Sequence, residues 1–253
     1  TYSIITNVDE EHMDHYKNMK NLKKHFIKFI EKTPSLGKSL ICVDDKNNND
    51  IIKNIKNKNY HTYGISLNSN FRIQNINQNI SYSSFDIKIS LPGKKITYLK
   101  NIKVPMIGLH NIRNATAASA VAFIIGISKS NIKKGLKNFK GVQRRFNYLF
   151  KYRNSIFFDD YAHHPSEIIE VLNGANEVYS NKKICCIFQP HRISRLKNLK
   201  KQFTYSFKKA DMVVLCPIYK AGENIKLGFS YYNFAKEIAS NSKVKLIIIK
   251  NEL

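Results

Sequence analysis

Apolar residues in the first part of the chain alternate between strand-like runs and helical spacing. Short apolar runs typical of buried strands occupy Tyr2–Val8 and Leu40–Val43. Asn21–Ile30 carries apolar residues at helical spacing, and isoleucines within residues 51–55 mark a second helix. This order of strand, helix, strand and helix predicts a parallel sheet with crossover helices.

The hydrophobic period changes to two between Phe71 and Val104. Apolar and polar residues alternate there on both sides of Pro92–Gly93, which predicts antiparallel strands joined by a turn. Helical spacing returns after Gly108 with a face of small residues, and a further short helix is predicted up to Gly141.

A second alternation of strands and helices begins at Phe146. It predicts a strand ending at Phe158, a helix that opens at Pro165, and a helix that runs through Leu199 and Phe207. Further strands are predicted at residues 184–188, 212–215 and 244–249, with a last helix near residues 234–238. We interpret the chain as α/β: a central domain at residues 1–143, with a mixed sheet, and a C-terminal domain at 144–253 built on a second open sheet.

The chain of 253 residues carries 42 Lys and Arg against 18 Asp and Glu, a formal net charge of +24. A basic surface can bind phosphate backbones without reading sequence. The lysines are scattered, however, and they accompany an excess of Asn and Ile. Because these three residues share A/T-rich codons, we favour genome bias as the cause and expect no specific nucleic-acid partner.

The lengths of the apolar runs and the positions of the cysteines also indicate the cellular environment in which we expect the protein. No apolar run approaches a membrane span, so we expect no membrane partner. The four cysteines lie in apolar runs without Cys-x-x-Cys spacing, which indicates neither a zinc site nor a disulfide framework and fits a reducing, cytoplasmic setting. The chain opens on an apolar run without Met, which we interpret as the start of a fragment.

Polar side chains gather in the Asp-Asp-Tyr-Ala-His-His-Pro segment at residues 159–165. We interpret Ser155–Phe158 before it as a short buried strand, and Pro165 as the start of a helix. Open α/β sheets bind ligands at the carboxyl ends of their strands. A solvated capping loop is the alternative, but five chemically active side chains in succession favour a ligand site.

A second motif, Gly-Leu-His-Asn-Ile-Arg-Asn-Ala, occupies residues 108–115 at the start of a predicted helix. Asn111 alone would be interpreted as a helix cap, yet an exposed amide can also read the edge of a purine. With the alanine-rich helix behind it, the motif resembles that of the Mur ligase family, ATP-dependent enzymes that build the peptide stem of bacterial peptidoglycan.

Three further segments match the same family in the right order, and the resemblance covers essentially the whole chain. Residues 6–14 resemble the segment whose His binds a catalytic magnesium ion, and residues 141–146 resemble the Gly-x-x-Arg-Arg-Phe junction between domains. Residues 159–165 together with 188–195 resemble the members that add L-alanine. Phe26 stands where other members carry a carbamylated lysine, which favours the same branch.

The resemblance implies a central ATPase domain followed by a Rossmann-like C-terminal domain. It also implies ligation of L-alanine to the muramoyl carboxylate of UDP-N-acetylmuramate, through an acyl phosphate and at the expense of ATP with Mg²⁺, in peptidoglycan precursor synthesis. The family's phosphate-binding glycine loop and its UDP-sugar domain are absent and would lie upstream of Thr1. The chain also stops at Leu253, before the family's last elements. We therefore expect this segment alone to be inactive.

Site residues are carried over from the resemblance motif by motif. His12 is expected to hold Mg²⁺ and Arg145 to stabilise phosphate charge across the gap between domains, as the two catalytic residues; a core histidine and a solvated linker charge are the alternatives. Asp159 is expected to accept from the ribose hydroxyls. The residues expected to contact the nucleotide are His110, Asn111, Asn114, Arg145 and Asp159.

Amino-acid capture is expected in the C-terminal domain. An Arg fork matches a carboxylate bidentately in a way that Lys cannot, so Arg192 and Arg195 are predicted to hold the alanine carboxylate, with phosphate binding or plain solvation as alternatives. Glu223 is a candidate to face the ammonium group. The residues expected to bind substrate are Tyr161, His163, His191, Arg192 and Arg195.

Two competing functions stay open from the sequence. A family member that joins a murein peptide shares the segment at residues 159–165, but a bulky peptide would not need the compact clamp of His191, Arg192 and Arg195. A basic nucleic-acid-binding protein is the alternative from another class, and the sequence lacks the aromatic residues interleaved with basic ones that would favour it.

Overall fold

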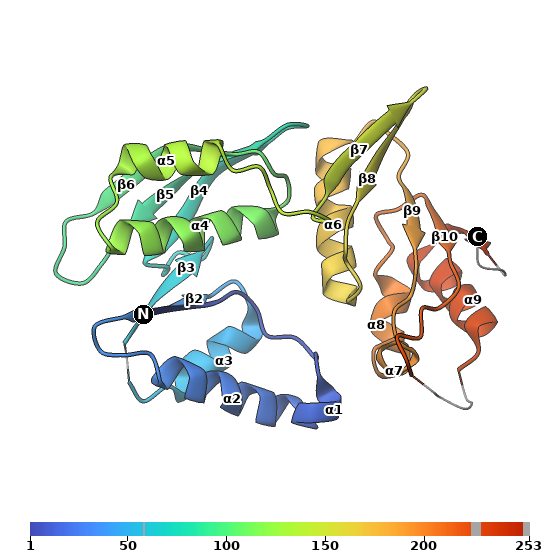
Figure 1. Ribbon diagram of the computed structural model, residues 1–253, viewed down its shortest axis with the longest axis horizontal. Helices are drawn as coiled ribbons and strands as arrows, with labels where there is room; N and C mark the ends of the chain where they lie inside the picture. The colour runs from blue at the N-terminus through green and yellow to red at the C-terminus, as the bar shows by residue number, and fades with distance from the viewer. Residues whose placement is uncertain (58, 224–228, 250–253) are drawn as a thin grey trace. The chain divides into compact units, whose positions relative to one another are not determined.

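The computed structural model describes residues 1–57, 59–223 and 229–249, and it divides into two compact units (Figure 1). The N-terminal unit comprises Thr1–Met106 and His110–Lys140, and the C-terminal unit comprises Ile107–Leu109 and Gly141–Leu253. Each unit has its own sheets and is described by itself below.

The N-terminal unit is built on a six-stranded mixed sheet whose strands follow chain order. The four strands β1 to β4 pair in parallel, whereas β4, β5 and β6 pair antiparallel. The prediction of a mixed sheet with an antiparallel portion is therefore confirmed. The strands are β1 (Tyr2–Ile5), β2 (Lys38–Cys42), β3 (Tyr60–Gly64), β4 (Phe71–Gln78), β5 (Ser83–Ile89) and β6 (Thr97–Val104).

Helices cover this sheet, and side chains at their first turns define where they begin. Asn18 and Asp45 accept hydrogen bonds from the backbone N–H groups of Asn21 (2.9 Å) and Asn48 (2.8 Å), which satisfies donors that a helix start leaves open. In Figure 1, α2 and α3 lie together beside the β1–β2 end of the sheet, and α4 and α5 lie along β4–β6. The helices are α1 (Met13–Tyr16), α2 (Met19–Glu31), α3 (Lys46–Asn54), α4 (Leu109–Ile124) and α5 (Lys129–Lys137).

Two details of the N-terminal unit differ from the sequence interpretation. The first strand ends at Ile5, not Val8, and Val8 is buried in the loop that follows. Strand β3 was not predicted, because its sequence Tyr-His-Thr-Tyr-Gly contains no aliphatic residue to mark a buried strand. It is a strand nonetheless, because β3 pairs in parallel with both β2 and β4.

The C-terminal unit contains a hairpin and a separate three-stranded parallel sheet. The hairpin joins β7 (Asn147–Tyr152) and β8 (Ser155–Asp159). The sheet has the order β11-β10-β9 and all its pairs are parallel. Its strands are β9 (Cys185–Phe188), β10 (Met212–Leu215) and β11 (Lys245–Ile248), and the helices of the unit are α6 (Pro165–Val178), α7 (Ile193–Asn198), α8 (Lys200–Tyr205) and α9 (Tyr231–Ser242).

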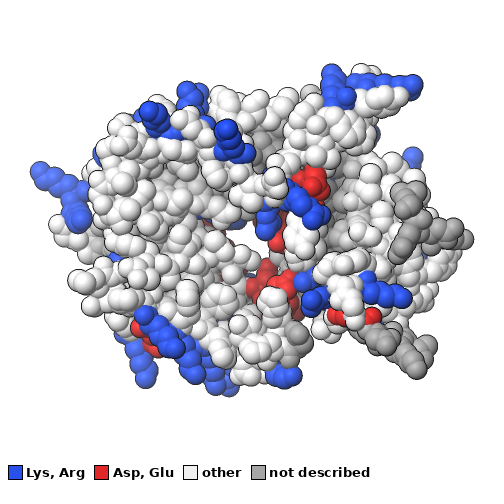
Figure 2. Space-filling model, in the orientation of Figure 1, with Lys and Arg blue, Asp and Glu red and all other residues white. Residues whose placement is uncertain are grey.

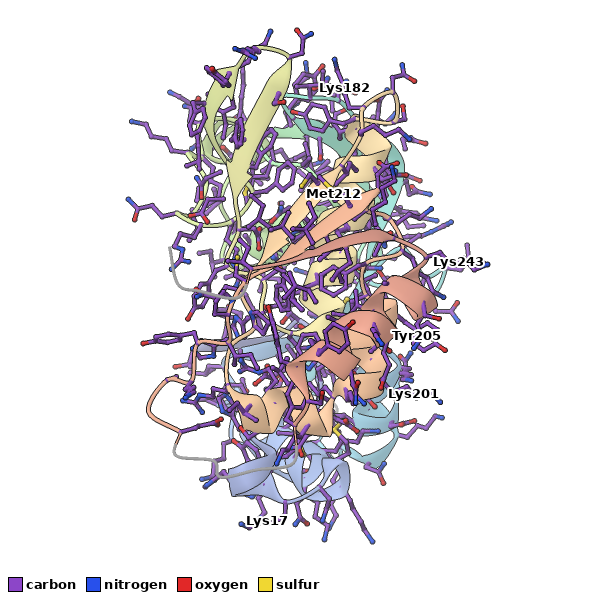
Figure 3. The ribbon with its side chains drawn as sticks, turned by 90° about the vertical axis from the view of Figure 1, so that its right-hand side faces the viewer. Lys17, Lys182, Lys201, Tyr205, Met212 and Lys243 are labelled. Atoms are coloured by element: carbon purple, nitrogen blue, oxygen red, sulfur yellow. The ribbon has the colours of Figure 1, made fainter. Side chains whose placement is uncertain are left out.

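An apolar core joins the helices to this sheet. Figure 3 shows the sheet beside α8 and α9, with Met212 at the start of the central strand and Lys243 at the end of α9. Phe203, Phe207 and Phe234 are fully buried, and they pack with the inward-facing residues of β9 and β10. The expected open sheet with covering helices is confirmed for this part of the chain.

Two predictions in the C-terminal unit are wrong. Ser155–Phe158 is not a buried strand of the open sheet, because β8 pairs with β7 in the hairpin and its residues are exposed or half-buried. Its apolar rings are instead covered by each other, as in the stack of Phe150 on Phe157 at 4.5 Å between ring centroids. The helix predicted through Leu199 and Phe207 is two short helices that meet at Leu199, and Phe207 follows the second.

Surface charge and thiols complete the description. Lys and Arg are spread over the visible face in separate groups (Figure 2) and do not form a single stripe. All four cysteines are free thiols, and burial raises the pKa of Cys186 to about 12. Within the described part of the chain, no helix has the length and apolar character needed to cross a membrane.

Candidate functional site

Four aromatic side chains of the C-terminal unit form a continuous row. The ring centroids of Tyr161 and His163 lie 4.9 Å apart, those of His163 and His191 lie 5.9 Å apart, and those of His191 and Tyr219 lie 5.4 Å apart. Tyr161 and His163 come from the loop after β8, whereas His191 and Tyr219 follow β9 and β10. Three of the predicted substrate-binding residues are thus brought together, and Tyr219 joins them without having been predicted.

A buried carboxyl group shapes the first of these loops. Asp160 accepts from the backbone N–H groups of Phe146 (2.8 Å) and Ala162 (2.7 Å). Burial raises the pKa of Asp160, and these two hydrogen bonds oppose the rise. Asp160 therefore has a structural task, namely to fold the chain back after β8 so that Tyr161 and His163 project from it.

The helix that follows begins with a reciprocal cap. His164 accepts at its Nδ1 atom from Ser166, while Glu167 accepts from the backbone N–H groups of His163 (3.0 Å) and His164 (3.2 Å). Burial alone would raise the pKa of Glu167, but these hydrogen bonds and the charges of His163 and Arg145 outweigh it and lower the pKa. The predicted start of a helix at Pro165 is confirmed.

The two arginines of the Arg-Arg-Phe segment reach different carboxylates. The Arg144 guanidinium lies 4.6 Å from the centroid of the Tyr161 ring, and its Nε atom lies 3.5 Å from Asp159. Arg145, predicted to be catalytic, lies with Nη1 at 3.5 Å from Glu167. Both arginines are exposed, so the pairs contribute little to stability and leave the guanidinium groups available to an anion.

The loops after β9 and β10 are joined by backbone hydrogen bonds. The N–H of Tyr219 donates to the carbonyl of Pro190 (2.8 Å), and the N–H of Arg192 donates to the carbonyl of Tyr219 (2.9 Å). His191 and Tyr219 accordingly form a parallel bridge. Both loops lie at the carboxyl edge of the parallel sheet, the edge where such sheets bind ligands.

Arg195 turns back from α7 onto His191. Its Nη1 atom donates to Nδ1 of His191 at 3.2 Å, so a neutral His191 carries its proton on Nε2. Burial lowers the pKa of His191, and the charges of Arg195, His163 and Arg192 lower it further. Arg192 lies at the N-cap position of α7 with φ 67° and is exposed. The cluster is therefore a cationic, half-buried surface suited to a small carboxylate.

Glu223 follows β10 and faces the first turn of α7. Its carboxylate accepts from the backbone N–H of Ser194 (3.1 Å) and from the Ser194 hydroxyl. The sequence interpretation singled out Glu223 for the ammonium group and did not anticipate Ser194 as its partner. Residues 29 apart in sequence give no local signal for such a contact.

In the N-terminal unit, His12 lies in an exposed loop after β1. It occupies the N-cap position of α1 with φ 57° and makes no side-chain cap. Across the described residues, no group of three or more His, Cys, Asp or Glu side chains could hold a metal ion. This donor set does not fit a metal site built by the protein alone.

The predicted adenine-binding residues lie in the first two turns of α4. Asn111 is 6 % exposed, whereas Asn114 is exposed and His110 is half-buried. Because α4 begins at Leu109, Asn111 lies within the first turn and not at the N-cap position. Positions three apart share a helix face, so Asn111 and Asn114 lie on the same side of α4.

An ion pair fixes the start of α4 to the sheet. Arg113 donates from Nε to Asp44 at 2.8 Å, and Asp44 also accepts from the backbone N–H of Ile65 (2.9 Å). Gly64 makes room for this carboxylate, because a Cβ atom there would lie 2.5 Å from an Asp44 oxygen. The sequence patterns predicted no role for Arg113, Asp44 or Gly64.

Each unit is thus an α/β fold with cationic side chains near strand and helix ends. Two family models match the chain: the Mur ligase middle domain at residues 1–122, and the Mur ligase, glutamate ligase domain at residues 144–252. The chain belongs to the Mur ligase family, as the sequence motifs predicted.

Individual relatives with similar sequences carry the name of one particular ligase. The chain is 63 % identical over 252 residues to the UDP-N-acetylmuramate--L-alanine ligase of Pelagibacter ubique, covering 100 % of this chain and 54 % of the relative. It is 40 % identical over 245 residues to the enzyme of the same name from Rickettsia felis, covering 95 % and 51 %. The chain spans about half the length of the curated relatives it matches.

A solved structure supports the fold. The crystal structure of UDP-N-acetylmuramate-alanine ligase from Thermotoga maritima matches with a TM-score of 0.71 and 24 % identity, covering 98 % of this chain and 50 % of that one.

Proposed function

We propose that this chain is part of an ATP-dependent ligase that joins L-alanine to the muramoyl carboxylate of UDP-N-acetylmuramate in peptidoglycan precursor synthesis. The observation that carries the proposal is the 63 % identity over 252 residues to a ligase of that name. The cationic cluster at the carboxyl edge of the C-terminal sheet supports it, because the cluster suits a small carboxylate.

The proposed reaction has two steps. The γ-phosphoryl group of ATP is transferred to an oxygen of the muramoyl carboxylate, which yields ADP and an acyl phosphate. The neutral amine of alanine then attacks the acyl carbon, inorganic phosphate leaves with the C–O bond electrons, and the amine loses a proton to give the amide. Phosphoryl transfer depends on positioned positive charge, since charge accumulates on the transferred oxygens.

Alanine is proposed to bind in the C-terminal unit through its carboxylate. Arg195, held against His191 at 3.2 Å, presents a guanidinium fork beside the aromatic row, and Arg192 adds positive charge at the start of α7. Tyr161 and His163 border the same cluster from the loop after β8. Charge-assisted hydrogen bonds of this kind contribute about 1.5 to 3 kcal/mol each.

Two sets of residues are proposed for the nucleotide, each within its own unit. Asn111 and Asn114 would read the adenine edge, with His110 beside them, and Asp159 would accept from ribose hydroxyls. Arg145 is exposed, so its guanidinium group would be able to bind a phosphate of the nucleotide while it keeps its contact with Glu167.

Magnesium is proposed only as an ion held chiefly by oxygen atoms of phosphate and water. Mg²⁺ keeps several waters and binds few protein ligands beside substrate phosphates. His12 would be one ligand at most, consistent with the lack of a donor cluster among the described residues. When bound, the ion would neutralise phosphate charge.

Lysine substitutions at the two arginines test the alanine site. In a chain restored to the length of the relatives, Arg195→Lys and Arg192→Lys should each raise the KM for alanine by about tenfold to a hundredfold while the KM for ATP changes little. The measurement is release of ADP that depends on both alanine and UDP-N-acetylmuramate. Lys197→Gln, on the exposed side of α7, is the matched control. A defect confined to ATP dependence would contradict the proposed alanine site.

A further inference from the structure

Helix α7 carries Arg195 but does not cap its own first turn. It has six residues, its N-cap residue Arg192 makes no side-chain cap, and Arg192 adopts φ 67°. The first backbone N–H groups of any helix have no partner within the helix. A helix this short has little stability of its own, so its direction depends on contacts from outside.

Glu223 supplies the missing partner from the loop after β10. One carboxylate oxygen accepts from the Ser194 N–H at 3.1 Å, and the other accepts from the Ser194 hydroxyl. Burial acts to raise the pKa of Glu223, but the hydrogen bonds from Ser194 and Ile193 and the charge of Arg192 together lower it. The carboxylate is therefore held in its charged form at the positive end of α7.

This contact continues the backbone pairing between the two loops. Tyr219 bridges to His191 and exchanges hydrogen bonds with Pro190 and Arg192. Glu223 then reaches the next residues along, at the first turn of α7. On the other side, Leu196 is fully buried in the core of the C-terminal unit and holds the helix to it. The loop after β10 thus determines how the cationic end of α7 is presented.

We propose that Glu223 is a positioning residue, which fixes the first turn of α7 and through it the placement of Arg195 against His191. The inference rests on the proposed function, in which these two side chains receive the alanine carboxylate. It differs from direct recognition of the ammonium group, because both carboxylate oxygens of Glu223 are already engaged by Ser194.

Two small ligands separate positioning from direct contact. L-Alanine carries both a carboxylate and an ammonium group, whereas propionate has the same carbon skeleton without the amine. Titrations of the 253-residue chain, followed by NMR signals of the His191 ring and the Arg195 guanidinium, give the affinity for each. Glu223→Gln should weaken both ligands by the same factor, about fivefold or more, since one charge-assisted contact is lost upstream of the carboxylate site.

Ligand-free spectra provide a second readout. Glu223→Gln should shift the His191 and Arg195 signals before any ligand is added, and Ser194→Ala, which removes the hydroxyl partner, should shift the same signals by less. Glu237→Gln is the matched control, because Glu237 is a carboxylate of the same unit paired with Lys200 on the surface. It should leave the spectra and both affinities unchanged.

The outcomes distinguish positioning by Glu223 from its direct contact with the ammonium group. Weaker binding of alanine with unchanged propionate affinity would overturn positioning in favour of direct ammonium contact. Unchanged ligand-free signals in Glu223→Gln would also overturn it. If wild-type chain binds neither ligand, the alanine site of the proposed function fails, while the ligand-free comparison still decides the role of Glu223.

Discussion

Helices α4 and α7 both carry candidate binding residues, and each is anchored near its start by a carboxylate from another loop. Helix α4 has 16 residues, seven of them buried, and Asp44 holds Arg113 in its second turn. Helix α7 has six residues, of which Leu196 is buried, and Glu223 holds Ser194 in its first turn. In both helices a carboxylate from a separate loop contacts a residue near the helix start, but we expect this contact to have a different effect in each.

The difference lies in what each helix would do without its carboxylate. Helix α4 packs along its length, so loss of Asp44 would leave its position largely set and would cost stability instead. The Asp44 side chain is 10 % exposed and also accepts from the backbone N–H groups of Ile65 and Ser66, beside Gly64. Its loss would therefore leave Arg113 and these two backbone donors without their acceptor. Helix α7 is anchored by a single buried side chain, so loss of Glu223 would affect geometry more than folding. Length and burial decide which effect prevails.

The largest predicted effect is on the stability of the N-terminal unit. Asp44→Ala should lower the free energy of unfolding by about 2 to 4 kcal/mol, because a largely buried Arg113 loses its partner. Urea unfolding followed by circular dichroism measures it.

The control for this substitution is Asp50→Ala. Asp50 pairs with Lys23 at the same 2.8 Å separation, but its carboxylate is half exposed. Little change is expected there. Equal losses in the two variants would mean that burial does not distinguish the Asp44 pair.

A smaller effect is predicted for nucleotide use. Asn111→Ala, in a chain restored to the length of the relatives, should raise the KM for ATP by about twofold to tenfold, as expected for one neutral hydrogen bond. The KM for alanine should change less, and initial rates with each substrate varied separately measure both. An unchanged KM for ATP would mean that Asn111 only packs within the fold. In that case α4 would lose Asn111 as a candidate binding residue, whereas α7 would keep its own.

Sequence alone predicted α4 well, because its apolar residues recur at helical spacing and one motif occupies its start. The Mur ligase motifs also predicted the family and named Tyr161, His163, His191 and Arg195, which the structure brings together. The roles of these side chains stay predictions.

What sequence could not supply was long-range pairing. Ser155–Phe158 has the composition of a buried strand, yet it pairs with β7 in a hairpin whose rings cover one another. Nothing local marks Glu223 as the partner of Ser194, or Gly64 as the space for Asp44, since both depend on loops that meet only in the folded chain.

The smallest predicted effect concerns pH and the cap of α6. Because the folded protein lowers the pKa of Glu167, Glu167 contributes stability above its unfolded pKa and loses that contribution as pH falls through its folded pKa. Glu167→Gln should be less stable than wild type at pH 7, by about 1 kcal/mol or less, and the difference should narrow towards pH 3.

Urea unfolding at a series of pH values checks this prediction. Asp160, whose pKa is raised, contributes with the opposite sign. The charge of Glu167 is one cause of that rise, so Glu167→Gln also reduces the destabilising contribution of Asp160 at pH 7. A difference that widens at low pH would contradict the assigned direction. A constant difference would mean that the cap works through shape and not through charge.

The mixed sheet of the N-terminal unit also sets an order of folding. In the antiparallel portion, β5 pairs with strands next to it in sequence, so Ser83–Ile89 needs only short loops to close. The parallel pair β1–β2 joins Tyr2 to Lys38 across both α1 and α2. Closing the longer loop costs more entropy before any contact repays it. The β4–β6 meander is therefore the expected nucleus of this sheet, onto which the parallel pair β1–β2 is added later.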